Sequence, residues 1–359
     1  MAKQRVGILF GGKSVEHEVS IQSARNVYEA IDKSKFDVVL IGIDKAGRWQ
    51  AADMARLQAA TSPTAELAAG ASDGALAFVP GEAPPYDVVI PLLHGTYGED
   101  GTVQGLLKLA NIPFVGAGVL GSAVGMDKDV AKRLLRDAGI PVARFVTLTP
   151  RTAGAASFET LAAEFGAPFF VKPANSGSSV GVSKVRNAAE WAAARAEALR
   201  YDGKLLVEEF IRGREVEVAV LGNDDPQASV AGEIAPRHEF YSYAAKYLDE
   251  HGAALRIPAA LAPEVAERVR SLAVRTFLAL ECAGMARVDF FVTEAGGIYV
   301  NEINTIPGFT KISMYPKLWE ATGVTYAQLI ERLIELALER HRAEQRIETT
   351  FRPVLPPAS

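Results

Sequence analysis

Four polar residues near the C-terminal end of the chain have the types and spacing of a metal site: Arg287, Asp289, Glu302 and Asn304. They lie in two apolar, strand-like runs separated by a turn, a pattern that predicts a β-hairpin. Because successive side chains of a strand point to opposite faces, all four lie on one face and apolar side chains cover the other. A pairing of Glu294 with Gly297 beside the turn would place Asp289 opposite Glu302 and Arg287 opposite Asn304.

Two opposed carboxylates repel each other unless a positive group lies between them. Directly opposed residues have Cβ atoms roughly 4.5–5.5 Å apart. Asp, Glu and Asn side chains together offer only oxygen ligands, the set that Mg²⁺ prefers. The sequence therefore predicts that Asp289, Glu302 and Asn304 hold Mg²⁺, with Mn²⁺ as the alternative ion. The competing interpretation is a solvated sheet face on which Arg287 pairs with Asp289.

Basic and glycine-rich segments upstream could hold the phosphates of a nucleotide. Lys172 ends the apolar run FFVKP, where a charge costs free energy unless it meets an anion. In the Gly/Ser segment that follows, Gly177 and Gly181 would let backbone amides approach a phosphate. Lys128, in MDKDVAK, adds a second cation. Taken alone, the Gly/Ser segment is equally compatible with a flexible turn.

Two acids in LLVEEFIRGREVEV extend the nucleotide hypothesis. Glu208 and Glu215 flank a bend in the chain and could accept hydrogen bonds from the amine or the ribose hydroxyls of a nucleotide. As solvated acids at strand edges they would need no function, so both interpretations stay open.

Residues 7–14, GILFGGKS, match the P-loop pattern literally, but we reject that interpretation. A P-loop is a loop whose amides wrap phosphates, whereas Gly7 lies inside an apolar strand and only residues 11–13 are left for the turn. The segment is predicted to be a strand-to-helix turn that brings Glu16 to a ligand. Alternatively, Glu16 is an acid of the first helical turn that the helix dipole favours.

The elements that must position these residues follow two patterns. In the first third of the chain, strands such as RVGILF, FDVVLIGI and YDVVIPLLHG alternate with helices, which predicts a parallel, doubly wound sheet. Residues 51–75, rich in Ala, Ser and Pro, are expected to be a peripheral excursion. Beyond residue 165 the runs PFFVKP, SVGVSKV, KLLVEEFI and EVEVAVLG predict antiparallel strands. The last helix opens with a capping-box pattern at Thr325.

Composition limits the class of protein. A chain of 359 residues is too long for one core, so two or three domains are expected. The formal charge of −5 without a basic run argues against nucleic-acid and anionic-membrane partners. Cys282 is the only cysteine, which excludes an internal disulfide and fits the reducing cytoplasm. No apolar run is long enough to span a membrane.

Together these segments resemble the ATP-grasp superfamily and, within it, the D-alanine–D-alanine ligases of bacterial wall synthesis. The resemblance extends from GILFGGKSVEHEVS through LLHGTYGEDGTVQGLL, GVLGSAVGMDK and VKPANSGSSVGV to VNEINTIPGFTKISMYP. It implies an ATP-grasp fold of the α/β and α+β classes. A Rossmann-like N-terminal domain (residues 1–122) would precede two α+β domains (123–214 and 215–345) that sandwich ATP, and a loose tail (346–359) would follow.

The resemblance also implies a reaction. A carboxylate is a poor electrophile, so phosphate transfer from ATP would first convert one D-alanine to an acyl phosphate, which the amine of a second D-alanine attacks. The product is D-alanyl-D-alanine, a precursor of peptidoglycan, and the family suggests a homodimer. Two rival hypotheses are a ligase for another acceptor, such as D-lactate, and a nucleotide-binding regulator that has lost the chemistry. An intact metal face argues against the regulator.

Site residues carry over from the resemblance by their position in the motifs. Cofactor-binding residues would be Lys128, Lys172, Glu208, Glu209, Ile211, Glu215 and Lys246. Glu16 would take the ammonium group of the first D-alanine, with His94 nearby. The guanidinium of Arg287 and the amide of Gly308 would stabilise the tetrahedral oxyanion. The carboxylate of the second D-alanine would bind at Ser313 and Met314.

The segment FYSYAAKY, residues 240–247, is predicted to belong to a lid within residues 238–252. A lid is expected because the acyl phosphate must be kept from water. By resemblance, Lys246 would reach the γ-phosphate, and Tyr247 would hydrogen-bond Ser178, which in turn meets Glu16. The tyrosine at this position favours an amine over D-lactate as the acceptor. The alternative is a disordered loop with surface tyrosines.

Overall fold

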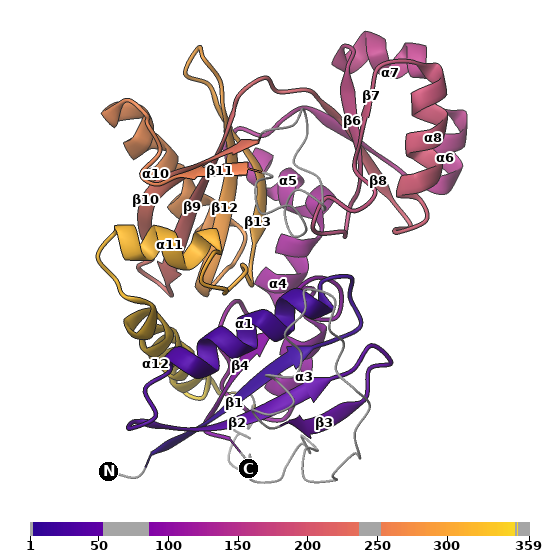
Figure 1. Ribbon diagram of the computed structural model, residues 1–359. Helices are drawn as coiled ribbons and strands as arrows, with labels where there is room; N and C mark the ends of the chain where they lie inside the picture. The colour runs from indigo at the N-terminus through magenta and orange to yellow at the C-terminus, as the bar shows by residue number, and fades with distance from the viewer. Residues whose placement is uncertain (1–2, 53–85, 237–252, 349, 351–359) are drawn as a thin grey trace, which may run out of the picture.

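The computed structural model describes residues 3–52, 86–236, 253–348 and 350, and within them three sheets form three regions (Figure 1). The N-terminal region lies below the other two in Figure 1, and the central and C-terminal sheets lie side by side above it. The predicted lid, with Lys246 and Tyr247, lies outside the described residues.

The N-terminal sheet has the order β3-β2-β1-β4. Its strands are β1 (Gln4–Gly11), β2 (Phe36–Ile43), β3 (Trp49–Ala52) and β4 (Val88–Leu92). The predicted parallel pairing is confirmed for β1 with β2 and β4. β3 is an antiparallel edge strand that the sequence did not predict, and it holds the first two residues of the expected excursion; the rest of residues 51–75 lies outside the described part.

Alternating residues of β1 build two cores in the N-terminal region. Val6, Ile8 and Phe10 face helices α1 (His17–Ala30) and α12 (Tyr326–Glu344), whereas Leu9 faces α3 (Thr102–Leu109) on the other side. Such a strand, covered on both faces, reads as a continuous apolar run, as RVGILF does. The glycine turn after β1 then leads into α1.

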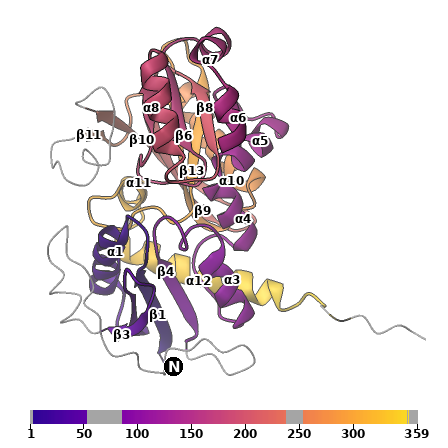
Figure 2. The same cartoon turned by 90° about the vertical axis from the view of Figure 1, so that its right-hand side faces the viewer.

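The central region is an antiparallel sheet of order β5-β8-β6-β7. Its strands are β5 (Phe145–Leu148), β6 (Phe169–Pro173), β7 (Ser183–Val185) and β8 (Leu205–Glu209). Helices α6 (Pro150–Ala155), α7 (Phe158–Phe165) and α8 (Ala188–Ala198) cover its outer face (Figure 2). The prediction that a strand begins at Ser179 was wrong, because Ser178 and Ser179 have left-handed backbone angles that no strand accommodates.

Helices α4 (Val119–Met126) and α5 (Lys128–Asp137) connect the N-terminal region to the central one. Asp127 ends α4 and caps α5, since its side chain accepts hydrogen bonds from the backbone N–H groups of Asp129 and Val130. In Figure 1, α5 lies between the two upper sheets.

The C-terminal sheet has the order β11-β10-β9-β12-β13 and is antiparallel. Its strands are β9 (Arg214–Gly222), β10 (Gln227–Pro236), β11 (Ala253–Arg256), β12 (Gly284–Val292) and β13 (Ile298–Asn304). Helix α10 (Pro263–Ala279) packs on the apolar face, and α11 (Met314–Ala321) covers part of the opposite face.

Helix α12 is the last element of the described part of the chain and packs against the N-terminal sheet. The predicted capping box is present: Thr325 Oγ1 accepts from the Gln328 N–H, and the Gln328 side chain accepts from the Thr325 N–H. The three sheets agree with the expected three domains, but the domain boundaries stay a prediction. Those boundaries assign α12 to the third domain, although this helix packs on the first sheet.

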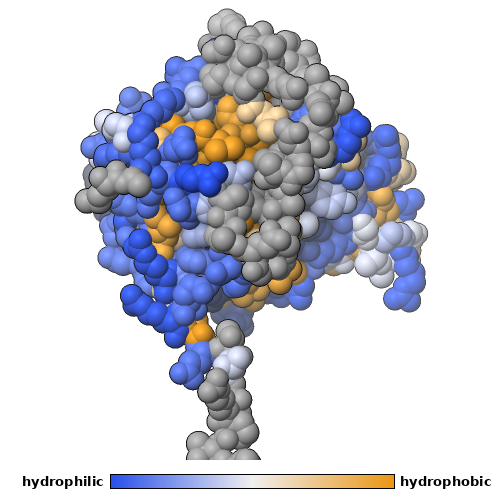
Figure 3. All heavy atoms as spheres, turned by 90° about the horizontal axis from the view of Figure 1, so that it is seen from below, coloured by the Kyte–Doolittle hydropathy of each residue, from blue (hydrophilic) through white to orange (hydrophobic). Residues whose placement is uncertain are grey.

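The surface of the described residues is mainly hydrophilic when the molecule is seen from below, with apolar atoms gathered in separate patches (Figure 3). No helix among these residues is both long and apolar enough to cross a membrane.

Candidate active site

The β12–β13 hairpin presents the predicted polar face. Asp289 pairs with Glu302 and Arg287 with Asn304, as predicted, and the alternate residues Val288 and Phe290 are buried on the opposite face. Arg287 and Asp289 side chains are only 17% and 14% exposed. The face is therefore largely closed rather than solvated, although it does contain the Arg287–Asp289 pair of the competing interpretation.

The predicted pairing beside the turn was wrong by one residue. Thr293, not Glu294, closes the loop with Gly297, because its backbone N–H and side-chain hydroxyl both engage Gly297. A β-bulge between the pairs Asp289–Glu302 and Phe290–Val300 then inserts Asn301 and restores the predicted register. The two offsets cancel, so the register is right where the acids lie.

The bulge changes the direction of the Asn301 side chain, which strict alternation of strand residues would not predict. It turns Asn301 toward the central sheet, where its Oδ1 accepts a hydrogen bond of 3.2 Å from Lys172 Nζ. The sequence did contain a signal for this bulge: Asn301 and Glu302 are adjacent polar residues in VNEIN, and two neighbouring polar residues break the two-residue period of a strand.

Cations already neutralise the two opposed carboxylates. Arg287 donates from Nε and Nη2 to both oxygens of Asp289, each at 2.7 Å, and its Nε lies 2.9 Å from Glu217 Oε2. Lys128 Nζ lies 3.4 Å from Glu302 Oε2. Burial alone would lower the pKa of Arg287, but Asp289 and Glu217 raise it well above its ordinary value. Sequence reasoning missed Glu217, because only the β9–β12 pairing brings it beside Asp289.

The described residues contain no group of three or more His, Cys, Asp or Glu side chains that could hold a metal. The predicted set has two carboxylates and one amide instead. Its oxygens fit a hard divalent cation, and Asn304 already lies against Asp289, with Nδ2 donating to Oδ2 at 3.0 Å. The chemistry of the donors therefore fits magnesium, with Arg287 and Lys128 as the cationic partners of the carboxylates.

The two predicted phosphate lysines reach the same region from two elements. Lys128, on α5, donates to the Ser176 carbonyl at 2.7 Å. Lys172, at the end of β6, pairs with Glu208 Oε2 at 2.6 Å, which answers the expectation that its charge must meet an anion. A third lysine, Lys132, pairs with the other oxygen of Glu208 at 3.1 Å; sequence reasoning missed it.

The remaining predicted nucleotide residues lie at the end of β8 and the start of β9. The carboxylate of Glu209 turns away to the surface and pairs with Arg144 at 2.7 Å, so the structure does not bring that side chain to Lys172. Phe210, which follows Glu209 and was not predicted as a site residue, lines an open cavity of about 490 Å³. Ile211 and Glu215 are partly buried.

Glu16 is buried at the start of α1, beside the Gly/Ser segment. The Ser178 hydroxyl donates a hydrogen bond to Glu16 Oε1, so the predicted contact is present. A Cβ added to Gly95 would lie 2.9 Å from Glu16 Oε2, which shows how closely the chain packs here. The turn carries Glu16 to this position through Ser14, whose hydroxyl donates to the His94 carbonyl at 2.6 Å.

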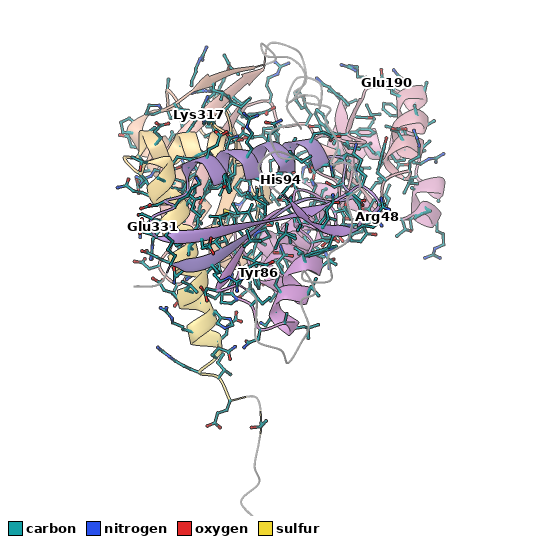
Figure 4. The ribbon with its side chains drawn as sticks, turned by 60° about the horizontal axis from the view of Figure 1, so that its bottom comes forward. Arg48, Tyr86, His94, Glu190, Lys317 and Glu331 are labelled. Atoms are coloured by element: carbon teal, nitrogen blue, oxygen red, sulfur yellow. The ribbon has the colours of Figure 1, made fainter. Side chains whose placement is uncertain are left out.

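His94 lies in the interior near α1, whereas Glu190 and Lys317 lie at the periphery (Figure 4). Its Nδ1 is 2.9 Å from the Ile306 carbonyl, which can only accept, so Nδ1 carries the proton and Nε2 faces the Ser23 hydroxyl. Burial lowers the pKa of His94. The neutral imidazole therefore ties the N-terminal region to the loop after β13.

Glu99 is a further acid that sequence reasoning missed, although it lies in the segment HGTYGEDG. Its carboxyl group accepts hydrogen bonds from the backbone N–H groups of Gly95 at 2.7 Å and Ile306 at 3.1 Å. Burial and the nearby charge of Glu16 raise its pKa to about 8. Glu99 is therefore mostly protonated at neutral pH.

The loop after β13 carries the other predicted substrate residues. The Gly308 amide has no hydrogen-bond partner among the residues that the structure describes. Ser313 is held in a turn, since its Oγ accepts from the Thr310 N–H at 3.0 Å. Met314 begins α11 and is buried. The free N–H group at Gly308 and the start of α11 both suit anionic groups.

The glycine turn after β1 does not form a P-loop. The Gly12 N–H donates to a β2 carbonyl at 2.8 Å and the Gly11 N–H to a serine of α1 at 2.7 Å, so both amides are used within the N-terminal region. The Lys13 ammonium lies 5.4 Å from the centre of the Tyr97 ring. These contacts agree with the rejection of the P-loop pattern.

Contacts between site residues join all three regions. Lys172 meets Asn301 and Lys128 meets Glu302 between the central and C-terminal regions. Ser178 meets Glu16 between the central and N-terminal regions. His94 connects the N-terminal region to the loop after β13.

Comparisons with known proteins cover nearly the whole chain. Residues 5–117 match the family model described as D-ala D-ala ligase N-terminus, and residues 134–335 match D-ala D-ala ligase C-terminus. The chain is 55% identical to D-alanine–D-alanine ligase A of Salmonella typhimurium over 98% of this chain and 100% of the relative. It is 53% identical to the D-alanine–D-alanine ligase of Shouchella clausii over 98% and 99% of the two chains.

Two solved structures are similar in fold. The D-alanine-D-alanine ligase from Coxiella burnetii is 41% identical, with a TM-score of 0.83 over 96% of this chain and 97% of that one. The VanG D-Ala:D-Ser ligase from Enterococcus faecalis is 36% identical, with a TM-score of 0.82 over 94% of this chain and 100% of that one.

Proposed function

The chain belongs to the D-alanine–D-alanine ligase family, and we propose that it joins two D-alanine molecules to D-alanyl-D-alanine with ATP, for the synthesis of peptidoglycan precursors. It is an ATP-grasp ligase. The observation that carries the proposal is that residues of all three regions meet at one site, through the contacts of Lys128, Lys172, Ser178 and His94. A site built from every region suits a reaction with three reactants, because each region can bring one group.

The first D-alanine would bind at the N-terminal region. Glu16 is the buried anion that takes its ammonium group, while neutral Glu99 and His94 add no competing charge. Ser178 holds the Glu16 carboxylate in place by hydrogen bonding. The substrate carboxylate is thereby directed toward the lysines and the hairpin.

The phosphate groups would bind between the central and C-terminal sheets. Lys128 and Lys172 reach this space from α5 and β6 and offset charge on the transferring phosphoryl group. Asp289, Glu302 and Asn304 supply the oxygen ligands for a divalent cation, and we assign magnesium to them. When bound, this ion neutralises negative charge as the phosphoryl group moves.

Amide bond formation would take place beside Arg287. Its guanidinium is fixed by Asp289 and Glu217, so it costs little reorganisation when the tetrahedral oxyanion forms. The free Gly308 amide is the second donor. Attack by the second amine forms the C–N bond of the tetrahedral intermediate. Its collapse breaks the C–O bond, phosphate leaves with the former carboxylate oxygen, and the nitrogen gives up one proton as the amide forms.

The acceptor is the part of the reaction that the fold restricts least. A D-Ala:D-Ser ligase has nearly the same fold as this chain, so another D-amino acid or D-lactate is the second candidate. Tyr247, which we predict to favour D-alanine, lies outside the described residues.

The test is a panel assay. Purified protein, ATP and magnesium are mixed with D-alanine alone or with D-alanine plus D-serine or D-lactate. Mass spectrometry identifies the products, and released phosphate is counted. D-alanyl-D-alanine should dominate in every mixture; a dominant mixed product would assign the other acceptor, and no phosphate release with any acid would refute the ligase.

Two further proposals concern the protein in its cell. We propose a homodimer in the cytoplasm, where ATP is available. The neighbouring helices α3 and α4 expose Leu109 and Leu120, at 74% and 61%, and apolar side chains of this kind suit a subunit interface. Light scattering coupled to size exclusion measures the mass; a mass of one chain would refute the dimer.

A further inference from the structure

Lys132 is the most completely buried charged side chain in the described part of the chain, with 1% of its surface exposed. It lies on α5 one turn after Lys128, so both lysines share a helix face. Its ammonium group is 3.1 Å from Glu208 Oε1 and 5.9 Å from the centre of the Phe145 ring. Among the described residues it has no other charged partner within ion-pair distance.

Glu208 is thus held by two cations. Lys172 pairs with Oε2 at 2.6 Å and Lys132 with Oε1 at 3.1 Å. One lysine would balance one carboxylate, and burying a second cation costs free energy. Fold stability therefore accounts poorly for Lys132, and its position beside the nucleotide residues suggests another role.

The two lysines differ in what else they can reach. Lys172 also contacts Asn301 across the space between the sheets, on the side assigned to the phosphates. Lys132 contacts Glu208 alone among the acids of the described part. In the proposed function Lys172 binds phosphate, and Lys132 would then be the remaining counter-charge of Glu208. Burial raises the pKa of Glu208, and the charges of Lys132 and Lys172 together more than offset this and lower it.

We propose that Lys132 is a positioning residue that keeps Glu208 ionised and oriented as a hydrogen-bond acceptor for the exocyclic amine of adenine, and thereby sets the preference for ATP over a 6-oxopurine nucleotide. The inference rests on the proposed function, which places the base at Glu208. It adds a residue that touches neither the base nor the reacting atoms.

The chemistry of the base explains why ionisation matters. A carboxylate only accepts hydrogen bonds, and the 6-amino group of adenine donates them, whereas the 6-oxo group of hypoxanthine only accepts. A buried carboxyl group without a counter-charge takes up a proton, and a protonated Glu208 can donate to a 6-oxo group. Loss of Lys132 should therefore weaken ATP binding and relax the discrimination against ITP.

The experiment compares kcat/KM for ATP and ITP in D-alanine-dependent phosphate release at pH 7, where Lys132, whose pKa burial lowers to about 8, is still mostly protonated. Lys132→Met keeps the length of the side chain and removes the charge. Lys132→Arg restores a cation. The matched control is Arg133→Met, the next residue on the same helix, whose side chain is 54% exposed and whose guanidinium pairs with Asp129 rather than Glu208. Circular dichroism verifies folding.

In Lys132→Met we expect the ATP/ITP ratio of kcat/KM to fall about tenfold or more, as for loss of one charge-assisted hydrogen bond. The change should appear mainly in KM. Lys132→Arg should recover part of the ratio and Arg133→Met should leave it unchanged. In a Glu208→Gln background, Lys132→Met should change the ratio no further, because the residue acts through Glu208.

An unchanged ratio in folded Lys132→Met, or an equal fall in the Glu208→Gln background, would overturn the proposal. Should Lys132→Met fail to fold, Lys132→Gln supplies the same neutral comparison with a smaller apolar change. A wild type that binds ATP over ITP without forming dipeptide would refute the proposed function alone, because equilibrium binding of the two nucleotides to each variant still tests Lys132.

Discussion

Replacing Glu302 by glutamine tests the proposed metal face with little cost to the fold. The side chain is 25% exposed and its ion pair with Lys128 is long, at 3.4 Å, so we expect this pair to contribute about 0–1 kcal/mol. The free energy of unfolding should therefore change by less than about 1 kcal/mol. Asp289 is less suitable, because Arg287 and Asn304 both donate to it and breaking a buried pair costs about 3–5 kcal/mol.

The effect of Glu302→Gln on turnover should be much larger than its effect on stability. A bound metal contributes several kcal/mol of charge stabilisation, and loss of about 3 kcal/mol of this lowers the rate roughly 150-fold. Phosphate release is measured while magnesium is titrated, and urea denaturation gives the stability. Because the charged ligand is lost, the variant should also need more magnesium for half-maximal rate.

The matched control is Glu294→Gln at the turn of the same hairpin, where the acid is exposed and far along the strands from the site. It should behave as the wild type in both measurements. A Glu302→Gln enzyme with normal turnover at low magnesium would refute the metal assignment, and a large loss of stability would show that the ion pair with Lys128 was underestimated.

Two further predictions concern the N-terminal region. Lys13→Ala should change activity only slightly, because Lys13 lies over the Tyr97 ring and the amides of its turn are used within the N-terminal region. A loss of ATP binding as large as that of Lys172→Ala would restore the P-loop interpretation. Glu99, whose pKa rises from 4.5 to about 8 on folding, keeps a proton that the unfolded chain releases, so its contribution to stability falls as pH rises from about 4.5 to 8 and then levels off. Between pH 7 and 9 the free energy of unfolding should therefore fall by about 1 kcal/mol less in Glu99→Gln than in the wild type. Urea denaturation at both pH values measures this fall, and an equal fall in the two proteins would contradict the raised pKa.

The parts of the fold that local pattern could predict were the parallel strands, the capped last helix and the polar face of the hairpin. Each depends on short-range periodicity or capping chemistry. The edge strand β3 was missed because its four residues, WQAA, have no clear alternation, and its pairing to β2 is a tertiary contact. The predicted strand from Ser179 failed because the Gly/Ser segment adopts backbone angles that depend on its packing against Glu16.

The missed site residues share one physical cause. Glu217, Lys132 and Glu99 become part of the site only through partners far along the chain: Arg287, Glu208 and Ile306 respectively. Their own sequence neighbourhoods are those of ordinary amphipathic strands, helices and loops. In contrast, Asp289 and Glu302 lie on one hairpin, so their opposition could be deduced from strand geometry, even though the turn was misplaced by one residue.

The central claim is that the carboxylate of one D-alanine is activated by phosphate transfer and then captured by the amine of a second. One measurement follows both steps. D-alanine labelled with ¹⁸O in its carboxylate is incubated with the protein, ATP and magnesium, and mass spectrometry then measures the ¹⁸O content and amount of the released phosphate and of the organic product. We predict one labelled oxygen in each phosphate and one D-alanyl-D-alanine per phosphate, with neither product from L-alanine. Unlabelled phosphate, or phosphate without dipeptide, would contradict the account.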